Sequence, residues 1–239
     1  MRPLAGELLL TAWENGASQH DLRRAMTMLS IAVSTNDCEQ LDALPIAERN
    51  LLLLRLHELS FGPLLNAFAT CPKCAAPLEF TVPVAAMVER LESQPSAAPV
   101  EWNAEGRQYQ LRSVTTEDLL VAMRAADVNA AQERILSRCL QVFPEPGPEP
   151  LSLLPAVMEK FEQLHASAEL SCAIECPTCS SHEVLDLDIA RFVWTEVHRA
   201  ARRLLSDIHT LACAYSWSEQ AITQMTPSRR AAYLELLSS

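Results

Sequence analysis

Two short cysteine motifs are the residues of this chain best suited to chemistry. They are Cys71-Pro72-Lys73-Cys74 and Cys176-Pro177-Thr178-Cys179, and each places two thiols on a tight turn. Four thiolates arranged as a tetrahedron are a common ligand set of a structural zinc ion. We call the two motifs the first and the second hook, and we expect them to share one structural zinc. The predicted ligands are Cys71, Cys74, Cys176 and Cys179.

The long spacing between the hooks does not exclude a shared site. Between Cys74 and Cys176 lie 101 residues, and closing a loop of that length costs roughly 5 kcal/mol of chain entropy. A structural zinc supplies on the order of 10–16 kcal/mol at neutral pH. Because the metal contribution is the larger one, we expect a single zinc ribbon that is split by a large insertion.

Other uses of these cysteines remain as alternatives, namely unligated thiols, two separate metal sites or redox chemistry. A redox Cys-x-x-Cys motif would open a helix, whereas Leu78, Phe80 and Val82 alternate with polar residues as in a strand. Cys172 and His182 lie close to the second hook. The pattern favours an inward strand residue for Cys172 and a turn residue for His182, but leaves open whether either replaces a ligand.

No catalytic motif accompanies the hooks. The chain lacks a Gly-x-Ser-x-Gly elbow, a phosphate-binding Walker loop and a His-Glu-x-x-His motif, and it has only five glycines. Four sulfur ligands would also leave no open coordination position for a substrate. We therefore expect no catalytic residues, no organic cofactor site and no enzymatic activity.

Composition limits the class of partner. The chain has 239 residues with a net charge of −11, which argues against a general affinity for nucleic acid phosphates. No secretory signal and no apolar stretch of membrane-spanning length occurs in it. Eight cysteines without such a signal indicate a reducing cytosol, where thiols stay free or bind metal. We expect no membrane insertion.

The periodicity of the chain predicts a mostly helical α+β protein. A short helix or turn is expected over Leu64–Ala69, a hairpin over Val100–Val114 and a helix over Ala130–Val142. The strongest helical pattern runs from Ile189 to Tyr215. The predicted regions are N-terminal helices (1–70), a split zinc ribbon with a small antiparallel β element (71–91 and 166–190), an inserted hairpin with helices (92–165) and a C-terminal helical region (191–239).

Several further segments give the chain a family resemblance. They are Glu48–Leu56, Ser60–Pro63, Tyr109–Arg112, Glu117–Leu119, Asp188–Trp194, Tyr215–Glu219 and Thr226–Leu234, together with both hooks. With them the chain resembles a bacterial and phage group that is similar to the baseplate hub assembly chaperones of T-even-type contractile phages. The likeness extends over most of the chain from about Ala43 and is strongest after Cys176.

The resemblance implies a non-enzymatic protein that helps to build, or remains within, the baseplate of a contractile tail or injection system. Its partners would be other baseplate or hub proteins, and any oligomer of this chain would form through the baseplate. It would act in the bacterial host cytoplasm during assembly or, if it stays in the particle, in the virion or injection-particle baseplate. The alternative is a zinc-ribbon adaptor for nucleic acid or the transcription machinery, which the acidic charge disfavours.

Overall fold

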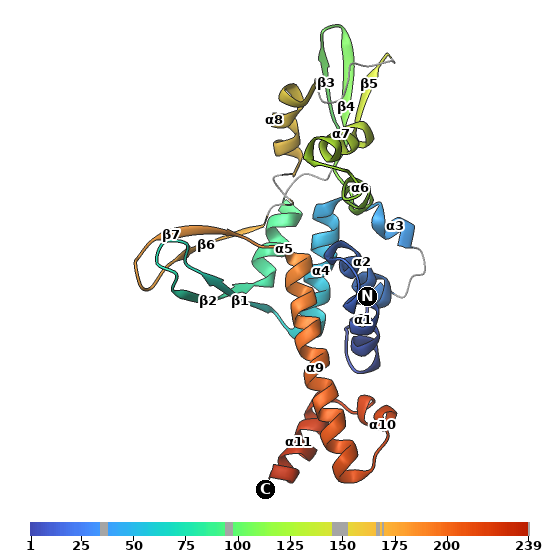
Figure 1. Ribbon diagram of the computed structural model, residues 1–239, viewed down its shortest axis with the longest axis vertical. Helices are drawn as coiled ribbons and strands as arrows, with labels where there is room; N and C mark the ends of the chain where they lie inside the picture. The colour runs from blue at the N-terminus through green and yellow to red at the C-terminus, as the bar shows by residue number, and fades with distance from the viewer. Residues whose placement is uncertain (34–37, 94–97, 145–152, 166–167, 169, 239) are drawn as a thin grey trace. The chain divides into compact units, whose positions relative to one another are not determined.

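The computed structural model (Figure 1) describes residues 1–33, 38–93, 98–144, 153–165, 168 and 170–238. The protein is α+β and about 59% helical, with small antiparallel sheets and a long C-terminal helix. This confirms the predicted mostly helical α+β class with small antiparallel β elements and a long C-terminal helix. No helix within the described ranges is both long enough and apolar enough to cross a lipid bilayer.

The chain divides into two compact units. Unit 1 consists of Met1–Asn36, Leu56–Gly62 and Ala190–Ser239, and unit 2 of Asp37–Arg55 and Pro63–Ile189. Helix α4 (Ile46–Phe61) therefore contributes residues to both units.

Unit 1 is helical. Its elements are α1 (Glu7–Ala17), α2 (Asp21–Val33), the end of α4, α9 (Ile189–Tyr215), α10 (Glu219–Thr223) and α11 (Pro227–Ser238). Apolar residues of α9 recur at helical spacing and are buried, as at Val193, Val197 and Ala201. The helix ends where Ser216 adopts a left-handed φ of 56°. The predicted long helix is thus confirmed at both ends.

Trp13 and Trp194 connect α1 and α2 to α9. A Cβ atom on Gly16 would lie 2.4 Å from the ring of Trp194, so only glycine allows this close approach. The guanidinium of Arg24 lies over the same ring, 4.8 Å from its centroid. The indole N–H of Trp13 donates to Nδ1 of His198 at 2.9 Å. Residues far apart in sequence therefore form one packed helical layer in this unit.

All the strands of the described residues belong to unit 2, where they form three small sheets. The antiparallel pairs are β1 (Leu64–Thr70) with β2 (Pro77–Pro83) and β6 (Ser171–Glu175) with β7 (His182–Asp186). The third sheet has the order β3 (Val100–Ala104), β4 (Arg107–Leu111) and β5 (Leu140–Phe143). The helices of this unit, besides the start of α4, are α3 (Cys38–Asp42), α5 (Val84–Ser93), α6 (Thr116–Ala122), α7 (Val128–Cys139) and α8 (Leu154–His165).

In unit 2 one predicted element is wrong and another is wrong at its C-terminal end. Leu64–Ala69 forms strand β1 instead of a helix or turn, because it pairs with β2 and buries alternate residues, Leu65 and Ala67. The helix predicted over Ala130–Val142 ends at Cys139, and the following residues pair with β4 as strand β5. In both places pairing with another strand outweighs the local helical preference.

A buried carboxylate organises the insertion between the hooks. Asp118 has no exposed surface, and it accepts hydrogen bonds from Arg112 at 2.6 and 3.0 Å and from Arg138 at 2.6 Å. Thr115 completes the arrangement as the N-cap of α6, in a reciprocal capping box with Asp118. Burial raises the pKa of Asp118, but these donors outweigh it and hold the pKa well below its usual range. Asp118 is therefore an ionised structural group.

We expect Asp118→Asn to reduce the free energy of unfolding by about 3 kcal/mol near pH 7, as when one partner of a buried ion pair is removed. The lowered pKa means that the unfolded chain takes up the proton first as the pH falls below about 4. The advantage of the wild type is thus full above that pH and shrinks as acid is added. Urea unfolding of both proteins between pH 7 and pH 3 measures this. A difference that grows toward low pH would contradict the assignment.

Candidate metal centre

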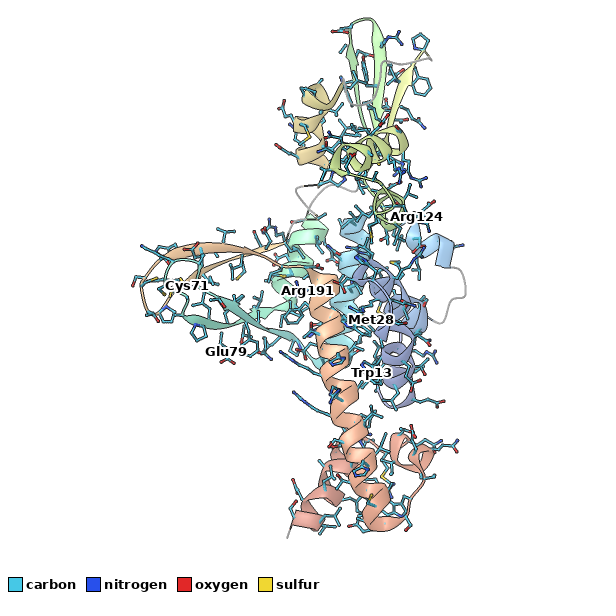
Figure 2. The ribbon with its side chains drawn as sticks, in the orientation of Figure 1. Trp13, Met28, Cys71, Glu79, Arg124 and Arg191 are labelled. Atoms are coloured by element: carbon cyan, nitrogen blue, oxygen red, sulfur yellow. The ribbon has the colours of Figure 1, made fainter. Side chains whose placement is uncertain are left out.

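Each hook forms the turn of a β-hairpin in unit 2. In the first hook, between β1 and β2, the N–H of Cys71 donates to the carbonyl of Ala76, and the N–H of Ala75 donates to the carbonyl of Cys71, both at 2.9 Å. Ala75 has a left-handed φ of 58°, which turns the chain back sharply. Figure 2 shows Cys71 at the turn end of this hairpin, with Glu79 farther along β2.

The second hook, between β6 and β7, repeats this geometry with different residues. The N–H of Cys176 donates to the carbonyl of Ser181 at 2.9 Å, and the N–H of Ser180 donates to the carbonyl of Cys176 at 2.8 Å. Ser180 has a φ of 53°, the counterpart of Ala75. The turn ends of the two hairpins come together (Figure 1).

The structure brings all four predicted sulfurs into one cluster. Their Sγ atoms lie within 4.8 Å of one another. Two contacts of 3.7 Å join Cys71 to Cys179 and Cys74 to Cys176. A tetrahedral ion with metal–sulfur bonds of about 2.3 Å needs sulfurs roughly 3.8 Å apart. The four side chains can therefore hold a metal ion after small movements.

Only a small apolar core surrounds the cluster. Cys71 and Cys176 are 1% and 0% exposed, and they pack with Leu78. Cys74 is exposed and Cys179 is half-buried. Isolated two-stranded hairpins are marginal in water, and burying one leucine contributes only about 2–3 kcal/mol. The packing alone is thus a weak clamp between the hairpins.

Ser181 is a residue of this site that sequence reasoning missed. Its Oγ lies 3.2 Å from Sγ of Cys179 and 3.5 Å from Sγ of Cys71, so it contacts a sulfur of each hook. Comparing the two hooks would have singled it out, since it stands where the first hook has Ala76. The Ser181 hydroxyl, followed by backbone N–H groups of the hook, lowers the pKa of the Cys71 thiol to about 6.

The pKa of the Cys74 thiol is shifted in the opposite direction. The backbone N–H of Ala76 lowers the pKa of Cys74, but burial and the neighbouring sulfurs outweigh it and raise this pKa to about 12. Several thiolates so close together repel one another, and a bound cation would compensate that charge. The chemistry of the donor set therefore fits a metal-binding cluster.

The two alternative ligands lie outside this cluster. Cys172 is half-buried on β6 opposite Leu185, and His182 is exposed at the start of β7 opposite Glu175. Across the described ranges, no other group of three or more His, Cys, Asp or Glu side chains brings its ligand atoms together for one ion.

The buried histidine of unit 1 has a packing role. His57 lies between the rings of Phe61 and Phe192, with centroid distances of 5.5 and 5.9 Å. Burial lowers its pKa to about 4, against a smaller opposing contribution from the backbone of Gly62, so the ring is neutral at physiological pH.

The chain was compared with known proteins in three ways. A scan against models of protein families, a search of curated proteins and a search of solved structures returned no match.

We expect Ser181→Ala to lower the metal affinity of the full chain about tenfold, the usual effect of removing a group that orients a ligand. The matched control is Ser180→Ala, which changes an exposed neighbour. Each variant replaces a serine of the second hook by the alanine found at the same place in the first. Competition against a chelator of known affinity measures the effect. Equal affinities for the two variants would show that the Ser181 hydroxyl does not support the ligands.

Proposed function

We propose that this protein is a non-enzymatic assembly or structural component of the baseplate hub of a contractile tail or injection system. In this proposal the two hooks form a split zinc ribbon, and one structural zinc holds Cys71, Cys74, Cys176 and Cys179. The observation that supports the metal site is the meeting of four sulfurs within 4.8 Å, from hooks that are separated by 101 residues in the sequence. The baseplate role rests on the family resemblance.

The donor set favours zinc and a structural role. Soft thiolates in a tetrahedral arrangement select zinc over the hard cations magnesium and calcium. Four protein ligands fill the coordination sphere, so the ion would have no position for a substrate. Its binding free energy, on the order of 10–16 kcal/mol, exceeds the roughly 5 kcal/mol needed to close the long loop.

Several residues in the segments of the family resemblance have structural roles in this chain. Arg49 is buried and donates to Thr116 at 3.3 Å, Asp118 is the centre of the insertion, and Trp194 packs on Gly16. A protein that works by assembly needs these residues to fix its shape, and the resemblance extends through such positions in both units.

The end of α9 and helix α11 offer a surface for a protein partner. Tyr215 stacks on Trp217 with centroids 4.5 Å apart, and Tyr233 meets Trp217 edge-on at 4.8 Å. Arg229 lies over Tyr233. Beyond them, Leu236 and Leu237 are 66% and 41% exposed. Tyrosine, tryptophan and arginine are enriched at the energetic centres of protein interfaces, so this surface suits a role in assembly.

Cys71→Ser should release the zinc and loosen both hooks, including the second one, because the remaining three sulfurs no longer complete the tetrahedron. Elemental analysis of the purified chain measures the metal. Hydrogen exchange at the amides of Cys176 and Ser180 measures the distant hook. Cys213→Ser, at an exposed cysteine of unit 1, is the control and should change neither. Full zinc content and full protection in Cys71→Ser would refute a shared site.

The biological role predicts a defect in particle assembly. Deleting the gene should abolish sheathed contractile particles in electron micrographs of lysates. The wild type and Cys213→Ser should restore them, and Cys71→Ser should not. Normal particles without the protein would contradict the baseplate role. Salt-sensitive binding of the purified chain to DNA or RNA would instead favour the zinc-ribbon adaptor.

A further inference from the structure

The sulfur cluster has a cross-paired arrangement. The two Sγ–Sγ contacts of 3.7 Å join Cys71 to Cys179 and Cys74 to Cys176, so each contact links one hook to the other. Each pair also combines one buried and one more accessible sulfur. Cys71 and Cys176 are buried, whereas Cys179 is half-buried and Cys74 is exposed.

This combination suits thiol oxidation. A sulfur that an oxidant can reach reacts first, and a sheltered neighbour then resolves the product as a disulfide. A disulfide needs sulfurs about 2.05 Å apart, so each contact pair must close by roughly 1.7 Å. Within each hook a backbone hydrogen bond, from Cys71 to Ala76 or from Cys176 to Ser181, holds the turn. The backbone of the hooks can therefore stay in place while the sulfur atoms approach each other.

We propose that a peroxide converts this metal site into two disulfides between the hooks, Cys71–Cys179 and Cys74–Cys176. The inference rests on the proposed zinc site. The β1–β2 and β6–β7 hairpins then stay joined after the metal leaves, through covalent bonds that span the insertion. Disulfides within the hooks would have the opposite effect, because each would close a four-residue loop and leave the hairpins free to separate.

The reaction is balanced with peroxide as the oxidant. In each pair the accessible thiolate attacks one peroxide oxygen and forms a sulfenic acid, and the other oxygen leaves as water after protonation. The partner thiolate then attacks the sulfenic sulfur and expels hydroxide, which a proton converts to a second water. Two pairs thus give four electrons to two peroxide molecules, and Zn²⁺ dissociates as the aqua ion.

The test uses the full chain with Cys172→Ser and Cys213→Ser, which remove one half-buried and one exposed thiol outside the cluster. Hydrogen peroxide is added while a chromogenic chelator reports zinc release. Free thiols are then alkylated, and a non-reducing digest is mapped by mass spectrometry. We expect the two cross-hook peptides, and faster migration on a non-reducing denaturing gel because a loop of more than 100 residues is closed.

Oxidation of the same chain in denaturant is the internal control. There short loops close more easily than long ones, so Cys71–Cys74 and Cys176–Cys179 should predominate and gel mobility should hardly change. The same hook-internal disulfides in the folded chain would overturn the proposal, as would sulfinic acids in place of disulfides.

The readouts separate the two claims. If the purified chain carries no zinc but still forms cross-hook disulfides, the metal site is wrong and the pairing stands. If the chain carries zinc and oxidises within the hooks, the pairing is wrong and the metal site stands.

Discussion

The meeting of the two hooks closes the long insertion of unit 2. Cys71 and Cys176 lie at hairpin turns that the sequence separates by more than 100 residues, and few apolar side chains surround them. A hairpin of two strands gains little from its own hydrogen bonds in water. The relation between these hairpins therefore depends on the sulfurs and on what they bind.

The insertion has a second and independent source of order. Asp118 is surrounded by Arg112, Arg138 and Thr115, next to an apolar cluster that includes Leu111 and Val114. This centre depends on an ionised carboxylate, whereas the hooks depend on thiolates. If a metal is bound at the hooks, its loss should loosen the hairpins without unfolding the insertion around Asp118.

Some elements of this fold could be predicted from the sequence and others could not. The hooks could be predicted because tight Cys-x-x-Cys turns are short local patterns, and α9 because seven turns of apolar periodicity exceed any local ambiguity. Strand β1 could not, since Leu64–Thr70 lacks β-branched side chains other than Thr70 and becomes a strand only through pairing with β2. Strand β5 depends in the same way on β4.

The same limit applies to the polar side chains. Ser181 gains its place beside two sulfurs from the turn of the second hook, and Asp118 acquires Arg138 from a different helix, twenty residues away. A sequence shows that a carboxylate or hydroxyl is present, but burial and distant partners decide what it does. The predicted boundaries between regions at residues 70, 91, 165 and 190 stay predictions. They were placed from sequence motifs, whereas the two compact units are defined by contacts.

Three polar side chains away from the hooks, Asp118, Cys139 and His57, have structural roles. Asp118 is locked by two arginines, and burial, with the nearby Asp118 charge, raises the pKa of the Cys139 thiol to about 12. His57 is neutral between two phenylalanines. These interior groups stabilise the shape of the protein. The half-buried Trp217 and Tyr233 and the exposed Leu236 and Leu237 suit the proposed role in assembly, because such a protein acts through the surfaces that contact its partners.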